Sequence, residues 1–157
     1  MGWLRPNEFF AGALSDVTET SLVLGRTNNS YNFLVGVGDQ GKIAVALGER
    51  GDFRCFECSE NYGHGGIIIP NPIFELHPDS LTEDYDYPVG SMLRRGDKLF
   101  ITNRVDRFGL STEGAVELQN NLPAGGGVAA FARWRVIIES DQQQTVLYSH
   151  PKVDQAE

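Results

Sequence analysis

The clearest pattern in the chain lies between Gly127 and Ser140, where two kinds of side chain alternate. One set of alternate positions is wholly apolar: Val128, Ala130, Ala132, Trp134, Val136 and Ile138. The other set mixes apolar residues with charged ones: Arg133, Arg135 and Glu139. A period of two is typical of a β-strand with one buried face. We therefore predict one long strand over residues 127–140, with Trp134, Val136 and Ile138 facing the core.

Shorter segments with the same alternation precede and follow this strand, and glycine-rich turns separate them. A hairpin is predicted where residues 31–37 and 42–47 flank the turn Gly-Asp-Gln-Gly. No segment repeats apolar residues with a helical period. Further strands are predicted at residues 21–24, 53–58, 67–69, 73–77, 98–105, 115–118 and 145–148. Such a series predicts an all-β, single-domain β-sandwich or flattened barrel with a long C-terminal hairpin strand.

The first residues of the chain are apolar but follow neither period. We interpret residues 1–12 as an N-terminal apolar arm, residues 13–149 as the all-β domain and residues 150–157 as a polar tail. An apolar arm must be covered by its own core or by another subunit. We predict that it contributes to an interface between subunits of a homo-oligomer, through Trp3, Leu4, Phe9 and Phe10.

Length and charge limit the partners of this domain. A chain of 157 residues can bury a core as one domain. Its formal net charge of −8 disfavours binding to a nucleic-acid backbone. No apolar run approaches the ~20 residues of a membrane helix, and the N-terminus lacks the apolar region of a signal peptide. We expect no nucleic-acid or membrane partner, no signal peptide, and a cytoplasmic or virion location.

The segment Gly36-Val-Gly-Asp-Gln-Gly41 matches the spacing of a dinucleotide-binding fingerprint. That fingerprint requires a following helix, whose N-terminal amides hold the pyrophosphate. Residues 42–47 instead alternate like a strand, and Asp39 would repel a phosphate. We therefore expect no cofactor.

The two cysteines of the chain, Cys55 and Cys58, are followed by His64. This short pattern is similar to a retroviral zinc knuckle, but His64 lies one residue too far along the chain. A spacing of three also places Cys55 and Cys58 on opposite faces of a regular strand. We predict ordinary thiols and no metal. Zinc held by Cys55, Cys58 and His64 is an alternative that needs a turn at residues 56–57, and a redox-active pair is a second alternative.

His77, Asp79 and Ser80 are the residue types of a catalytic triad, but a triad is a spatial arrangement that adjacency in sequence does not provide. The acidic residues between positions 79 and 86 do not have the spacing of an EF-hand loop. We predict no catalytic residue, and an enzyme with a strand-end active site remains an alternative.

Two segments, from Pro88 to Ile101 and from Asp106 to Thr112, together read GxxLxxGDxLxI and DxxGxxT. They resemble the β-rich head decoration (cement) proteins of tailed phages, in which short strands and Gly-Asp turns recur. The resemblance covers a small part of the chain. It implies a non-enzymatic protein that oligomerises and binds a larger protein lattice.

The function predicted from these observations is structural: a non-enzymatic assembly protein that oligomerises or binds a lattice, such as a virion decoration protein. A carbohydrate- or ligand-binding β-module is the first alternative, because Tyr85 and Tyr87 would supply aromatic contacts in an acidic loop. The enzyme is the second alternative.

Overall fold

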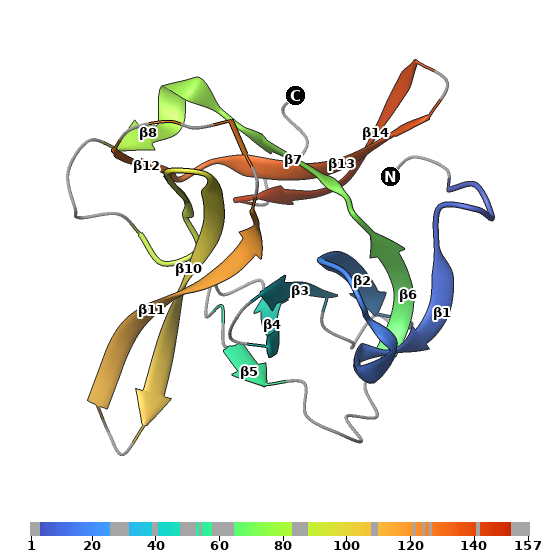
Figure 1. Cartoon of the computed structure of the whole chain (residues 1–157), viewed down its shortest axis with the longest axis horizontal. Helices are drawn as coiled ribbons and strands as arrows, with labels where there is room; N and C mark the ends of the chain where they lie inside the picture. The colour runs from blue at the N-terminus through green and yellow to red at the C-terminus, as the bar shows by residue number, and fades with distance from the viewer. Residues whose placement is uncertain are drawn as a thin grey trace.

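Over the residues that it describes, the computed structural model is all-β, with three antiparallel sheets and two short 3-10 helices (Figure 1). The predicted all-β class is therefore confirmed, and the sheets are open rather than closed into a barrel. The structure describes residues 4–25, 32–38, 41–47, 53, 55–57, 65–82, 88–107, 110–120, 122–123, 125, 127–140 and 142–151.

Six strands form the large sheet, in the order β1-β6-β2-β3-β4-β5. Its strands are β1 (Phe10–Ala13), β2 (Ser21–Gly25), β3 (Asn32–Gly38), β4 (Gly41–Leu47), β5 (Cys55–Glu57) and β6 (Gly65–Pro70). The predicted β3–β4 hairpin is confirmed, and Gly38 pairs with Gly41 at its turn. The 3-10 helix η1 (Leu14–Asp16) follows β1.

The middle sheet has five strands in the order β11-β10-β9-β12-β8. Their bounds are β8 (Leu81–Thr82), β9 (Met92–Arg95), β10 (Lys98–Arg107), β11 (Leu110–Gln119) and β12 (Val128–Phe131). The C-terminal sheet has the order β14-β13-β7, with strands β7 (Ile73–Leu76), β13 (Trp134–Ser140) and β14 (Gln143–His150). The 3-10 helix η2 (Pro78–Ser80) connects β7 to β8.

The prediction of one strand over residues 127–140 was wrong, because β12 ends at Phe131 and β13 begins at Trp134 in a different sheet. The η2 segment causes the break. The backbone N–H of Ala132 donates to the Ser80 carbonyl over 3.2 Å, and that of Arg133 donates to Ser80 Oγ over 3.0 Å. These donors are therefore used by a turn, and not by a neighbouring strand that would continue the ladder.

Burial along this segment follows the predicted face only in its central part. Trp134 and Val136 are buried, as predicted, whereas Ile138 is half-buried and Val128 is exposed. A register shift between Val136 and Ile137 marks a bulge against β14, and Ile137 on the opposite face is only 1% exposed. The bulge changes which side chains face the core at this point.

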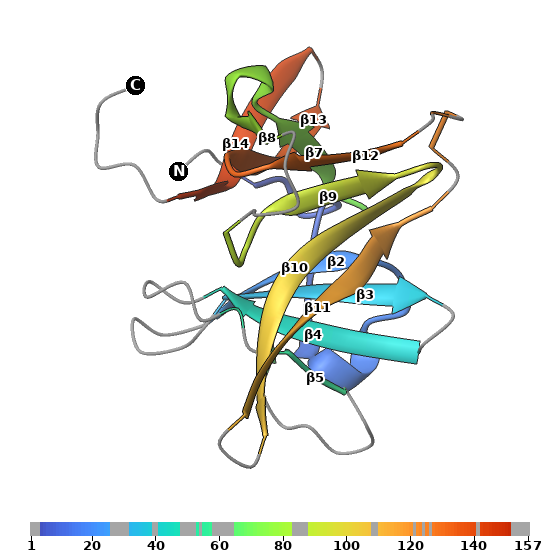
Figure 2. The same cartoon turned by 90° about the vertical axis from the view of Figure 1, so that its left-hand side faces the viewer.

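The described residues form two apolar cores, and the main one joins the sheets. The main core lies between the large sheet and the other two sheets, and its residues include Leu22, Leu34, Ile69, Met92, Ile101, Val116, Trp134 and Val136. A smaller core contains Leu14, which begins η1, and Val17, which follows it, with residues from strands of the large sheet such as Val23, Phe33 and Ile68. Apolar side chains from all three sheets meet in one cluster and give a sandwich-like packing. Figure 2 shows strands β2 to β5 of the large sheet below strands β9, β12 and β13.

The large sheet begins inside the segment that we interpreted as an arm, residues 1–12. Phe10–Ala13 forms β1, which pairs with Gly65–Ile68 of β6 at the sheet edge. In this register Phe10 lies opposite Ile68 and Ala11 opposite Ile67, so apolar cross-strand pairs support the pairing. At the other end of the chain, β14 runs to His150, the first residue of the expected tail.

Candidate functional site

The most prominent surface feature is the hairpin formed by β10 and β11, two strands of ten residues each. Strand β9 pairs with β10 only from Lys98 to Ile101. From Asn103 to Arg107, β11 is the strand paired with β10 among the described residues. We call residues 103–107 and 110–114 the distal hairpin. Figures 1 and 2 show it extending away from the sheets, so it forms an arm that leaves the body of the molecule.

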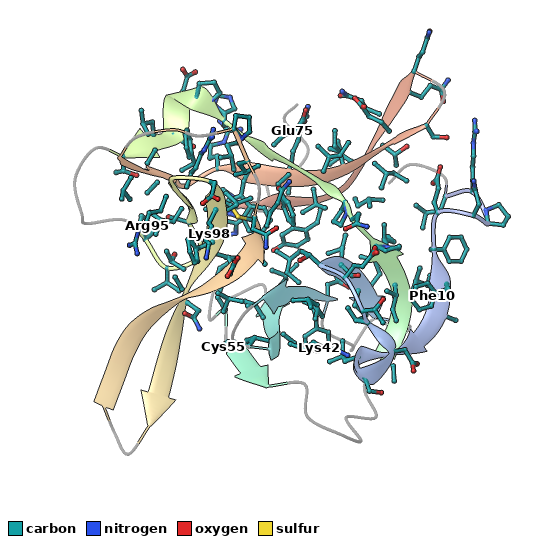
Figure 3. The ribbon with its side chains drawn as sticks, in the orientation of Figure 1. Phe10, Lys42, Cys55, Glu75, Arg95 and Lys98 are labelled. Carbon is teal, nitrogen blue, oxygen red and sulfur yellow. The ribbon has the colours of Figure 1, made fainter. Side chains whose placement is uncertain are left out.

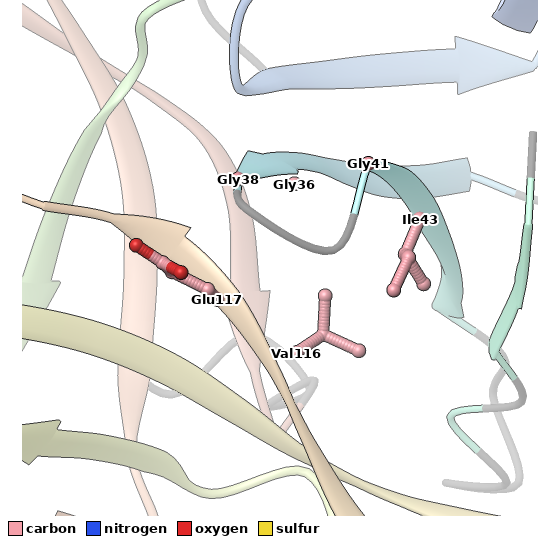
Figure 4. Close-up of a pocket in the computed structure, with 6 residues that line it drawn as sticks. All are labelled: Gly36, Gly38, Gly41, Ile43, Val116 and Glu117. Atoms are coloured by element: carbon pink, nitrogen blue, oxygen red, sulfur yellow. The ribbon is translucent and has the colours of Figure 1, made fainter.

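Glycines of the β3–β4 hairpin position the root of this arm. A Cβ atom added to Gly36 would lie 2.1 Å from the Glu117 carbonyl oxygen, so only glycine allows β11 to cross β3 this closely. The crossing leaves a cavity of about 10 Å³ beside Val116 and Glu117, room for at most one water molecule (Figure 4). The motif that matched a dinucleotide fingerprint thus packs two strands together, and it continues into strand β4 as predicted.

Buried polar side chains gather where the distal hairpin begins. Ser91, Thr102 and Asn103 are all buried. The Ser91 backbone N–H donates to Thr102 Oγ1 over 3.0 Å, and the Ser91 hydroxyl donates to the Pro88 carbonyl over 2.7 Å. Asn103 differs, because its amide nitrogen Nδ2 donates to Cys55 Sγ while its oxygen Oδ1 is buried without a partner among the described residues. Sequence reasoning missed Asn103, because its contact with Cys55 spans 48 positions.

Next to this polar group lies an aromatic junction, which we define as Phe53, Trp134, Tyr148 and His150. The His150 ring contacts Phe53 at 4.9 Å in a T-shaped arrangement and Trp134 at 5.3 Å between ring centres. Tyr148 lies 5.6 Å from Trp134. The indole Nε1–H of Trp134 donates to the Gly90 carbonyl over 2.7 Å. The junction therefore joins β13 and β14 of the C-terminal sheet to Phe53, which precedes β5, and to Gly90, which precedes β9.

Gly90 is required at this junction for two reasons. Its φ of +90° lies in the region that favours glycine, and a Cβ atom there would lie 2.2 Å from the Phe53 ring. Burial among these rings lowers the pKa of His150 below its ordinary value of 6.5 and raises the pKa of Tyr148 above its ordinary 10.0. His150 therefore packs in its neutral form near pH 7.

The zinc alternative is only partly visible in the structure. Cys55 lies on β5 (Figure 3), whereas Cys58 and His64 lie outside the described residues. Within the described part of the chain, no three residues of the types His, Cys, Asp and Glu are grouped to hold a metal ion. Tyr85 and Tyr87, the aromatic residues of the ligand-binding alternative, also lie outside the described residues.

The residues of triad type do not form a triad. The Ser80 hydroxyl donates to the His77 carbonyl over 2.7 Å, and His77 Nδ1 accepts from the backbone N–H of Asp79 over 3.2 Å. The serine and the imidazole therefore each bond to backbone groups. Together they close η2, the turn that separates β12 from β13.

The four predicted interface residues are divided between core and surface. Leu4 and Phe9 are half-buried and pack against the main core of their own chain. Phe10 lies on the edge strand β1 with 43% of its surface exposed (Figure 3). Trp3 lies outside the described residues. A role for these residues between subunits stays a prediction, and Phe10 is the described residue best placed for it.

A family model matches residues 11–157, which include the strands of all three sheets. Its description is "Uncharacterised protein y4lG". The chain belongs to the y4lG family. No curated protein and no solved structure matches the chain. The region matched to the y4lG family contains both the β10–β11 hairpin and Trp134, Tyr148 and His150 of the aromatic junction. None of the described helices is long and apolar enough to cross a membrane.

Proposed function

We propose that this y4lG-family protein is a non-enzymatic assembly protein, which forms homo-oligomers or binds a larger protein lattice through the β10–β11 hairpin. The observation that carries the proposal is the distal hairpin, whose strands pair with each other from Asn103↔Gly114 to Arg107↔Leu110. An isolated two-stranded hairpin is at best marginally stable in water. Docking against another chain would add packing to the two strands beyond Asn103 and Gly114.

Exposed apolar side chains at the sheet edges support the same proposal. Among the described residues, the large exposed apolar side chains are Phe10, Ile73, Leu81, Val128 and Val146. All but Val128 belong to edge strands, namely β1, β7, β8 and β14. A strand edge offers unpaired backbone groups to another chain, and an apolar side chain beside it adds contact area. Association along these edges would cover both.

Virion decoration is one form of this function. It is supported by the GxxLxxGDxLxI and DxxGxxT segments, which lie on and around the β9–β10 and β10–β11 hairpins. In this form the partner is a protein lattice, and the hairpin contacts the lattice or a neighbouring copy. Acidic net charge is compatible with either contact, because neither needs a nucleic-acid backbone.

Shortening the hairpin tests the proposal. Asn103 and Gly114 are cross-strand partners, so replacing residues 104–113 with Asn-Gly closes the hairpin with a two-residue turn. We expect the variant to keep its β-sheet circular dichroism and to sediment as a smaller species than the full chain. A variant that keeps the full-length oligomer would contradict the assembly role of the hairpin. The matched control replaces Gln142 at the β13–β14 turn with Gly, which leaves the β10–β11 hairpin intact.

A further inference from the structure

Cys55 and Asn103 connect the edge of the large sheet to the root of the distal hairpin. Cys55 is a partly exposed thiol on the edge strand β5, and Asn103 on β10 is only 2% exposed. The Asn103 amide Nδ2–H donates to Cys55 Sγ. A donor directed at the sulfur favours the thiolate, which is the nucleophilic form of cysteine.

The other atom of the same amide provides the second observation. Asn103 Oδ1 is buried and has no hydrogen-bond partner among the described residues. Buried carbonyl oxygens in folded proteins are nearly always paired, so an orphan next to a reactive side chain calls for an explanation. Oδ1 and Nδ2 share one carbon atom, and the free acceptor therefore lies beside the donor that contacts the sulfur.

We propose that Cys55 is a site of oxidation by hydrogen peroxide, and that Asn103 holds the resulting sulfenic acid. The Cys55 thiolate sulfur attacks one peroxide oxygen, the S–O bond forms and the O–O bond breaks. Sulfur loses two electrons, and the departing hydroxide takes a proton to become water. The product is Cys55–SOH, whose hydroxyl is a strong donor that the parent thiol lacks. That hydroxyl donates to Asn103 Oδ1, and the orphan acceptor is then paired.

Asn103 is a positioning residue in this scheme. Its two amide atoms act on different states of Cys55, because Nδ2 stabilises the thiolate before the reaction and Oδ1 stabilises the sulfenic acid after it. Both contacts lie at the residue where the distal hairpin leaves the body. The oxidation site exists whether or not the hairpin binds a partner.

The first test compares the two cysteines of the chain. Cys58→Ser leaves only Cys55, and Cys55→Ser leaves only Cys58. Each variant is treated with hydrogen peroxide in the presence of dimedone, and the adduct is followed by mass spectrometry. We expect Cys55 to be labelled about tenfold faster than Cys58, as one hydrogen bond to a charged group would give. Equal rates, or faster labelling of Cys58, would overturn the proposal.

The second test separates the role of Asn103 from simple exposure. Asn103→Leu in the Cys58→Ser background removes both amide atoms at similar volume, and Asn103→Asp replaces the donor with an acceptor. We expect both to slow labelling of Cys55 by about tenfold, with thermal melts to confirm that each is folded. Unchanged labelling in either folded variant would refute the role of Asn103. The comparison of Cys55 with Cys58 decides the oxidation itself even if neither Asn103 variant folds.

Discussion

Trp134 is the residue with the most contacts of different kinds in the aromatic junction. Trp134 is 3% exposed, contacts His150 and Tyr148, and donates its indole N–H to the Gly90 carbonyl. It thus combines apolar burial with a satisfied polar atom, which is the usual condition for a tryptophan in a core. The same residue was predicted to be buried from its position in the alternating pattern.

Trp134→Ala should lower the free energy of unfolding by about 3–5 kcal/mol, because truncating a buried aromatic side chain leaves a cavity. Trp134→Phe keeps most of the volume and loses the hydrogen bond to Gly90, so its cost should be smaller than that of the alanine variant. Urea denaturation measures both. A loss below about 1 kcal/mol for Trp134→Ala would show that the junction is not a stabilising core.

Acid should destabilise the protein through His150. Burial holds the folded-state pKa of His150 below 6.5, so the unfolded chain binds a proton more readily than the folded one. The free energy of unfolding that depends on neutral His150 is therefore fully present above pH 6.5. It decreases as the pH drops from 6.5 towards the lowered folded-state pKa.

His150→Gln removes this group, and its stability should depend less on pH in that window. Thermal melts of both proteins between neutral and mildly acidic pH make the comparison. The same pH dependence in the variant as in the parent chain would exclude His150 as the cause.

At the scale of elements, contacts between distant residues explain what the sequence predicted and what it did not. The β3–β4 hairpin is local, and its glycine turn and alternation were sufficient to predict it. The break after Phe131 depends on Ser80, which is 53 positions from Arg133, while the alternation continues through the break. The Cys55–Asn103 and Trp134–Gly90 contacts, likewise, span 48 and 44 positions. Periodicity reports which face a residue occupies, but not which distant segment ends a strand.

Ser80→Ala should weaken the turn between β12 and β13. The Ser80 hydroxyl accepts from the Arg133 backbone N–H and donates to the His77 carbonyl, so its removal deletes both hydrogen bonds. The His77 carbonyl keeps the hydrogen bond from the Ser80 backbone N–H. We expect a loss of about 1–3 kcal/mol in urea denaturation. Asp79→Ala on the exposed side of the same 3-10 helix is the control and should change stability by less than about 0.5 kcal/mol. Equal effects would mean that the Ser80 hydroxyl does not hold the break.

At the scale of the whole molecule, two neighbouring residues of the N-terminal segment are expected to have different roles, one in stability and one in the proposed self-association. Phe9 packs against the main core, whereas its neighbour Phe10 is exposed on the edge strand β1. Phe9→Ala should therefore lower the free energy of unfolding by about 1–3 kcal/mol. Phe10→Ser should leave stability within about 0.5 kcal/mol and weaken self-association. The reverse result, with Phe10→Ser unfolding the chain and Phe9→Ala leaving it stable, would contradict the placement of this segment.

The proposed assembly role rests on the open sheet edges and the projecting hairpin of the whole molecule. Sedimentation equilibrium of the full-length chain over a range of concentrations tests this claim most directly. We expect a mass that is a multiple of the 17.3 kDa chain and that falls towards one chain on dilution. A mass of 17.3 kDa at every concentration would contradict the proposed self-assembly.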